Sequence, residues 1–232
     1  MKLILFILFS SLTFSSSARI MTYNILNYQD DNQRETKYID ILTGIEPNIL
    51  IIQEILGNEG FLNFKEDVLD ILNPNQWSSA NFTNQSAQQD IALYYYHDMF
   101  NLIESNVIET AQSSGTRDVI EWVLMHNLSE VEFNIYGAHF KASSGNSNAQ
   151  QRLEEATILR NHLNQLAESS FFILAGDLNI YSNDFESEPC FEMLIGFQDN
   201  NNGQLFDPIN RIGHWHNNSS FADVHTQSPR TS

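Results

Sequence analysis

The sequence predicts one layered domain of the α/β or α+β class, built around a mixed sheet. Short apolar segments alternate with segments of helical spacing in the first part of the chain, which is the order of strand–helix–strand units. Later apolar segments are joined by a short turn, which indicates hairpins and antiparallel pairing. The 232 residues are 42% hydrophobic and 12% aromatic, enough for a globular core, so a disordered chain is excluded.

The first eighteen residues are expected to be a secretory signal peptide. Lys2 precedes an apolar run at 3–9, and the small residues Ser16, Ser17 and Ala18 stand where a signal peptidase reads. The run is too short for a spanning helix, which needs about 20 apolar residues. We therefore expect cleavage after residue 18, a secreted or periplasmic protein and no stable membrane anchor. A lipid or helical anchor is the alternative.

The chain after the signal peptide begins with a strand, a helix and a second strand. Residues 19–26 alternate and are rich in strand formers, and residues 33–45 have helical spacing up to Pro47, which prevents extension. Residues 48–53 are a continuous apolar run, as in a strand buried on both faces. The apolar side of the helix is expected to comprise Tyr38, Ile41, Leu42 and Ile45.

The middle of the chain contains a second helical segment and then several strands. The helix is predicted over 58–72 and ends at the Asn-Pro-Asn sequence at 73–75. The strand-like runs that follow cover 91–96, 102–108, 119–125 and 131–139. A turn at 127–129 is expected to join the last two runs in a hairpin.

The clearest helix is predicted over 147–166, where Ser147 and Gln150 form a capping-box pattern. Arg152 and Arg160 are interpreted as charges on its exposed surface. Its apolar side is expected to comprise Leu153, Ala156, Leu159, Leu163 and Leu166. A buried strand at 171–175 and a shorter helix near 188–195 complete the pattern before a polar, asparagine-rich region.

Polar residues follow several of these apolar strands, at the sheet edge where catalytic groups collect in layered α/β domains. They are Asn24, Glu54, His139, Asp177 and Asn179. Each residue alone also has a structural interpretation. A carboxylate after a strand is often a cap, a single histidine is often a structural group, and Asp-x-Asn often forms an Asx turn. Their occurrence in this order indicates a common site.

Four motifs in order carry a resemblance to a known superfamily: Met-Thr-Tyr-Asn at 21–24, Gln-Glu at 53–54, Gly-Ala-His-Phe-Lys at 137–141 and Gly-Asp-Leu-Asn at 176–179. The set resembles the endonuclease/exonuclease/phosphatase superfamily, which includes deoxyribonuclease I, inositol polyphosphate phosphatases and bacterial sphingomyelinases. The resemblance implies a four-layer sandwich of two packed mixed β-sheets flanked by helices, with the site at one edge. It spans nearly all of residues 19–232.

Hydrolysis of a phosphate ester explains these residue types, because negative charge on the phosphate oxygens needs a divalent cation and hydrogen-bond donors. Glu54 with Asn24 is a candidate partial site for Mg²⁺, with Mn²⁺ or Ca²⁺ as alternatives. Asp177 is expected to orient a water, and the amide of Asn179 to donate to a phosphate oxygen, roles that the pair has in the superfamily. His139 is expected to donate a proton or a strong hydrogen bond to the phosphate.

Three further residues are candidates around this set. Asp90 is similar in position to the acid that holds the imidazole in deoxyribonuclease I, although an acid before a strand is commonly a turn residue. Arg117 and Lys141 are candidate substrate contacts through the phosphate, and Arg117 resembles the phosphate-contacting arginine of the nuclease branch. Exposed, solubilising charges are the alternative interpretation of both cations.

The chain departs from the superfamily at its end. Superfamily members finish with a strand and an Asp-His pair that supplies the general base, and residues 228–232 read Ser-Pro-Arg-Thr-Ser instead. His214 and His216 are interpreted first as part of a polar loop. The expectation is therefore a fragment or a variant that lacks the terminal strand.

Composition restricts the function further. The net charge of −18 excludes a passive nucleic-acid coating protein, which needs a broad basic face, and the single cysteine excludes an internal disulfide framework. The favoured function is an exported, Mg²⁺-dependent phosphodiesterase of nuclease type, a monomer with nucleic acid as substrate. A non-nuclease phosphoesterase for a lipid or sugar phosphate and a non-catalytic binding domain remain as alternatives.

Overall fold

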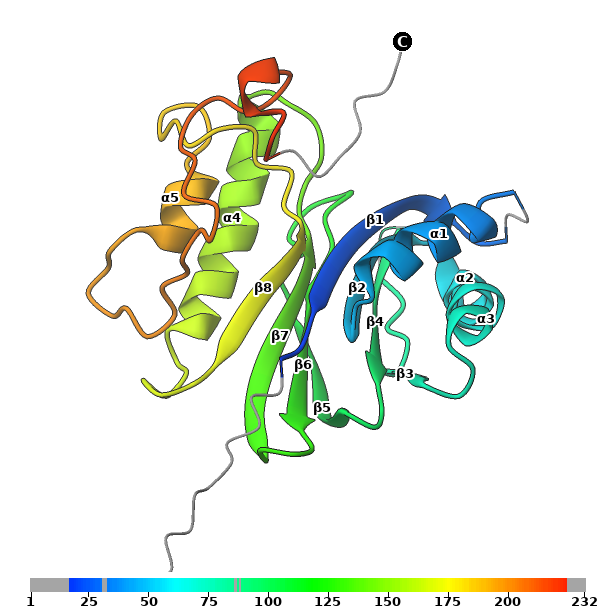
Figure 1. The fold of residues 1–232 in the computed structure, drawn as a ribbon. Coiled ribbons are helices and arrows are strands. Elements are labelled where there is room, and N and C mark those ends of the chain that lie inside the picture. The colour runs from blue at the N-terminus through cyan, green and yellow to red at the C-terminus, as the bar shows by residue number, and fades with distance from the viewer. Residues whose placement is uncertain (1–16, 31–32, 86, 88, 225–232) are drawn as a thin grey trace, which may run out of the picture.

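Two four-stranded mixed sheets pack face to face in the computed structural model, and helices cover the outer face of each sheet (Figure 1). The structure describes residues 17–30, 33–85, 87 and 89–224. This arrangement confirms the predicted four-layer sandwich. The proposed signal peptide lies almost wholly outside the described residues. Among the helices within them, none combines the length and apolar character that crossing a membrane requires.

The first sheet contains the N-terminal strands in the order β1-β2-β4-β3. These are β1 (Ile20–Tyr28), β2 (Ile49–Ile55), β3 (Trp77–Ser79) and β4 (Asp90–Tyr96). The β1 and β2 strands are parallel because α1 (Glu35–Ile45) returns the chain between them, and the other pairs are antiparallel. A continuous helical segment also covers this sheet, formed by α2 (Gly57–Phe64), a π-helical turn (Lys65–Leu69) and α3 (Asp70–Leu72).

The second sheet contains the next four strands in sequence order. These are β5 (Phe100–Ile108), β6 (Val119–His126), β7 (Val131–His139) and β8 (Phe172–Asp177). The α4 helix (Asn146–Leu163) connects β7 to β8, which are parallel, and packs with α5 (Cys190–Ile195) on the outer face (Figure 1). A short 3₁₀ helix (Ser219–Phe221) lies near the end of the described chain.

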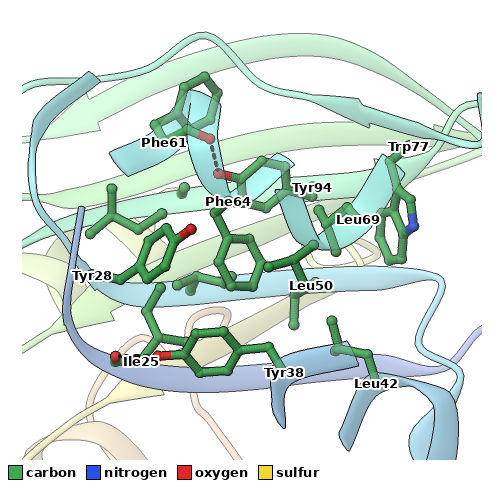
Figure 2. Close-up of a cluster of buried hydrophobic side chains, with 14 residues drawn as sticks. Ile25, Tyr28, Tyr38, Leu42, Leu50, Phe61, Phe64, Leu69, Trp77 and Tyr94 are labelled. Atoms are coloured by element: carbon green, nitrogen blue, oxygen red, sulfur yellow. Dashed lines mark hydrogen bonds between the residues drawn. The ribbon is translucent and has the colours of Figure 1, made fainter. Parts of the chain in front are cut away.

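The alternation of side chains in β2 divides the core into layers. Leu50 and Ile52 point to the helices, whereas Ile49 and Ile51 point into the space between the sheets. This two-sided burial explains the continuous apolar run at 48–53. The helix-side layer is rich in aromatic rings, and the hydroxyl of Tyr94 donates to the carbonyl oxygen of Phe61 at 2.7 Å (Figure 2).

Some expectations for individual elements are wrong. The strand β3 has only three residues, too few for a two-residue alternation to be recognised, and the prediction omitted it. The predicted capping box is absent: Gly145 is the N-cap of α4, and no side chain caps that helix. Ile41 is 38% exposed because the buried side of α1 is narrower than expected.

The interpretation of Arg152 and Arg160 as surface charges is also wrong, since both are fully buried. Arg152 donates to both carboxylate oxygens of Glu188, at 2.8 and 2.7 Å. The guanidinium of Arg160 donates to the carbonyl oxygen of Leu194 in α5 at 2.7 Å. Both arginines therefore attach α4 to segments that follow it much later in the chain.

Candidate functional site

Three predicted site residues meet where the two sheets come together. Asn24 is in β1, Glu54 is in β2, and Asp177 is the last residue of β8. The side-chain amide nitrogen of Asn24 donates to Glu54 Oε1 at 2.8 Å and to Asp177 Oδ2 at 3.0 Å. A single amide therefore joins two carboxylates from different sheets. The parallel pairs β1–β2 and β7–β8 produce this arrangement, because the carboxyl ends of parallel strands lie at the same edge.

Unusual backbone conformations accompany the site. Glu54 has a φ of 65° at the point where the pairing of β2 with β4 shifts register, so its side chain is turned out of the regular alternation. Asn179 also has a left-handed φ, of 50°. Such conformations cost energy, and they are concentrated at functional sites.

Gly176 permits the close approach of β8 to β7. Its φ is 152°, and a Cβ placed there would lie only 1.8 Å from the carbonyl oxygen of Ala138. Only glycine fits without separating the strands. The tight pairing places Asp177 beside His139 in the register of the two strands.

Asp177 and Asn179 face one cavity, as the sequence predicts. The backbone N–H of Asn179 donates to Asp177 Oδ1 at 3.2 Å, and its side-chain amide donates to the carbonyl oxygen of Phe140 at 3.2 Å. Both residues line a cavity of about 1230 Å³ whose other walls include Tyr181 and Trp215. The Asx turn and the shared site are therefore compatible.

His139 ends β7 and is only 3% exposed. Burial lowers the pKa of its imidazole to about 4, and the positive charge of Arg117 is the second cause. The negative charge of Asp177 opposes this shift. His139 is therefore neutral at pH 7, and it is suited to donating a hydrogen bond rather than a readily released proton. Among the described residues, its Nδ1 has no hydrogen-bond partner.

The structure does not support the expected contact between Asp90 and His139. Asp90 Oδ1 accepts from the backbone N–H of Gln85 at 2.7 Å, and Oδ2 accepts from that of Gly57 at 3.0 Å. Burial raises the pKa of this carboxyl, and these two backbone hydrogen bonds oppose the rise. Asp90 therefore orders the segments before β4 and α2, which corresponds to the turn-residue alternative.

Arg117 and Lys141 lie beside a second cavity. Arg117 is 6% exposed, and it donates from Nε to the carbonyl oxygen of Gln89 at 3.0 Å and from Nη2 to the side-chain oxygen of Gln89. The Lys141 ammonium lies over Gly115, whose added Cβ would be 3.1 Å from Nζ. This cavity of about 860 Å³ is lined by Asn27, Leu56, Ala87, Gln89, Ser113, Ser114, Gly115 and Arg117.

Two residues of this region were not predicted. Gln89 contacts both Arg117 and Glu54, and Glu155 of α4 accepts from the backbone N–H of Lys141 at 2.9 Å. Burial raises the pKa of the Glu155 carboxyl to about 7, against the effects of that hydrogen bond and of Arg117. The position of Glu155 beside Ala156, on the apolar side of the predicted helix, was the only sequence signal for its burial.

The carboxylate oxygens next to Asn24 suit a hard divalent cation that keeps several of its water molecules. Glu54 and Asp177 supply two carboxylates, and Mg²⁺ in proteins commonly takes one or two. Within the described part of the chain, no group of three or more His, Cys, Asp or Glu residues could hold a metal ion.

No protein-family model matches the sequence, and no curated protein matches it. The fold is similar to several solved structures. The human Nocturnin catalytic domain with bound sulfate has a TM-score of 0.61 and 20% identity, over 76% of this chain and 68% of that one. An endonuclease/exonuclease/phosphatase from Bacteroides vulgatus has a TM-score of 0.59 and 15% identity, over 78% and 71%.

The chain has the endonuclease/exonuclease/phosphatase fold. A mannosyl-6-phosphatase from Bacteroides thetaiotaomicron shares this fold with a TM-score of 0.58 and 16% identity, over 75% of this chain and 70% of that one. The predicted fold resemblance is therefore confirmed. In this fold, the strand ends that carry Asn24, Glu54, His139 and Asp177 meet at one edge of the sandwich.

Proposed function

We propose that this chain is a divalent-metal-dependent phosphodiesterase of nuclease type. The observation that carries the proposal is the pair of hydrogen bonds from Asn24 to Glu54 and Asp177, which gathers two carboxylates at the edge of the fold. The cavity beside Arg117 adds support, because the described residues that line it include no carboxylate and it leaves room for a phosphate next to a buried guanidinium. The apolar run at 3–9 supports export of the protein.

The proposal assigns a role to each residue of the site. Glu54 and Asp177 would hold Mg²⁺, which supplies positive charge against the phosphate oxygens when bound. Asn24, whose amide NH₂ donates to both carboxylates while its oxygen accepts from the backbone N–H of Leu26, would position them. The Asp177 carboxylate orients the attacking water by accepting a hydrogen bond. Asn179 and the neutral imidazole of His139 donate hydrogen bonds to phosphate oxygens. These donors stabilise the charge of the transition state without a change in their own protonation.

The first prediction concerns Glu54. Changing Glu54→Gln removes a negative charge and keeps the shape, so we expect Mg²⁺-dependent hydrolysis to fall about 10²-fold or more with an unchanged fold. The measurement is plasmid nicking against Mg²⁺ concentration, with circular dichroism to verify folding. Glu59→Gln is the matched control, because Glu59 is a nearby exposed acid on α2. Full activity of Glu54→Gln at saturating Mg²⁺ would remove Glu54 from the metal site.

A substrate panel tests the proposal itself. Supercoiled DNA, RNA, a sphingomyelin dispersion, inositol phosphates and a sugar monophosphate are incubated with Mg²⁺ and, separately, with a chelator. We expect cleavage of nucleic acid that requires the metal. Release of phosphate or phosphocholine without any cleavage of nucleic acid would contradict the nuclease assignment.

A non-nuclease phosphoesterase is the second candidate. The cavity of about 1230 Å³ beside Asp177 and Asn179 favours it, because aromatic and aliphatic side chains form much of its wall. Such a wall suits an apolar group attached to the phosphate. The sphingomyelin and sugar monophosphate reactions of the panel distinguish this candidate from the nuclease.

A further inference from the structure

Gln89 connects the two charged halves of the candidate site. Its side-chain nitrogen donates to Asn27 Oδ1 at 2.6 Å and lies 3.3 Å from Glu54 Oε2, and its side-chain oxygen accepts from Arg117 Nη2. The residue has a left-handed φ of 80° and directly precedes β4. This backbone conformation, which is costly for a residue with a Cβ, directs the carboxamide between Arg117 and Glu54.

The two ends of the carboxamide match the two charges. A buried guanidinium requires an acceptor, and a carboxylate at the site requires a donor or a cation. The oxygen of Gln89 meets the first requirement and its NH₂ group meets the second. A phosphate oxygen is a stronger acceptor for Arg117 than a neutral amide, because it carries negative charge and forms an ion pair with the guanidinium as well as a hydrogen bond.

The neighbouring cavity provides space for an exchange of partners. It measures about 860 Å³, and both Gln89 and Arg117 line it. The Lys141 ammonium over Gly115 adds a second positive charge next to the same loop. A phosphate group could therefore enter beside Arg117 as the carboxamide rotates into this space.

We propose that the carboxamide of Gln89 is an internal substitute for the substrate phosphate, which displaces it from Arg117 on binding. The inference rests on the proposed function, which assigns Arg117 to the phosphate. Gln89 competes with the ligand for Arg117 and satisfies Glu54 until the ligand arrives. Its removal therefore strengthens phosphate binding, whereas removal of a residue that merely supports the site weakens it.

The test measures binding of inorganic phosphate by isothermal titration, without metal. Gln89→Ala removes the competing carboxamide and keeps a Cβ at the same backbone angle. We expect phosphate to bind about threefold to tenfold more tightly than to the unaltered chain, the size expected for one hydrogen bond that no longer has to be broken. Gln165→Ala is the matched control, because Gln165 is exposed and its side-chain nitrogen donates to the carbonyl oxygen of Asn161 one helical turn before it.

Unchanged or weaker phosphate binding by a folded Gln89→Ala chain would overturn the proposal. If that variant does not fold, Gln89→Asn replaces it, because asparagine accepts left-handed angles and its shorter side chain cannot reach both Arg117 and Glu54. The same tightening is expected, and its absence counts against the proposal equally. Adding Arg117→Ala to the Gln89→Ala chain should abolish the gain in phosphate affinity. If the affinity stays raised in this double variant, Arg117 is not the residue that binds the phosphate.

The experiment separates this inference from the proposed function, because phosphate binding needs no turnover. Tighter binding by Gln89→Ala in a chain that cleaves no member of the substrate panel would support the displacement and contradict the nuclease. If the unaltered chain cleaves nucleic acid and Gln89→Ala binds phosphate with unchanged affinity, the nuclease function would be supported and the displacement of Gln89 contradicted. In an active chain, Gln89→Ala is also expected to lower KM for the cleaved substrate.

Discussion

Burial determines the charge of the two titratable residues that flank Arg117. The imidazole of His139 has its pKa lowered to about 4, and the carboxyl of Glu155 has its pKa raised to about 7, with burial as the main cause in both. Each group therefore favours its neutral form in the folded chain.

The two residues should affect stability with opposite dependence on pH. His139 binds its proton more weakly when folded, so its contribution is full above about pH 6.5 and is lost as the pH falls towards 4. Glu155 binds its proton more tightly when folded, so its contribution is full below about pH 4.5 and is lost as the pH rises through 7. The two dependences oppose each other between these limits.

Single variants should reveal the two effects. The free energy of unfolding of Glu155→Gln should increase relative to that of the unaltered chain as the pH rises from about 4.5 to 7. That of His139→Gln should increase relative to the unaltered chain as the pH falls from about 6.5 to 4. Each change should be of the order of 1 to 3 kcal/mol. Urea unfolding at several pH values measures it, with exposed Glu154→Gln as a control. Parallel curves for variant and unaltered chain would show that burial does not shift these pKa values.

At the scale of elements, Arg152 joins α4 to two segments around the site. It forms a paired ionic contact with Glu188, and its Nη1 donates to the carbonyl oxygens of Lys141 and Ser143 at 2.8 and 2.9 Å. Its guanidinium also lies 5.1 Å from the ring centre of Tyr181. The segment that carries Lys141 is therefore held against α4 by Arg152 as well as by Glu155.

Arg152→Met should consequently cost about 3–5 kcal/mol of the free energy of unfolding, because Glu188 would remain buried without its partner. Arg211→Met, which removes the exposed ion pair with Asp223, is the control and should cost less than about 1 kcal/mol. Urea denaturation measures both. The double change Arg152→Met with Glu188→Met should recover part of the loss, and similar losses for the two single variants would argue against a special role of the buried pair.

At the scale of the whole molecule, the proposed function requires a strongly acidic chain to bind an acidic polymer. The net charge is −18, and the cations placed at the candidate site are Arg117 and Lys141. Field lines concentrate in a cavity, so local charge can attract a phosphate despite the overall charge. The number of phosphates neutralised on binding must nevertheless be small.

Salt dependence measures this number. Two neutralised phosphates correspond to a slope of about −2 for the logarithm of duplex DNA affinity against the logarithm of salt concentration. Fluorescence anisotropy with the Glu54→Gln chain gives the slope without cleavage of the oligonucleotide. A slope of about −4 or steeper would show that further cations contact the polymer.

Much of the fold and part of the site follow from local pattern. Alternating and helical periodicities identified most of the strands and helices, because the burial of each face repeats with the geometry of the element itself. The motifs at strand ends likewise located Asn24, Glu54 and Asp177, since parallel strands bring their carboxyl ends to one edge. These inferences need only neighbouring residues and a general rule of sheet topology.

Tertiary structure alone decided which side chains are partners and how deeply they are buried. Arg152 has the pattern of an exposed helix charge, yet its partner Glu188 lies 36 residues away and both are buried. Gln89 became part of the site only because β4 lies beside β2 and brings its carboxamide to Glu54. The pKa of His139 depends on the charges and the apolar surroundings that packing places around it. Such properties depend on contacts between distant segments, whereas periodicity and motifs describe only the segment in which they occur.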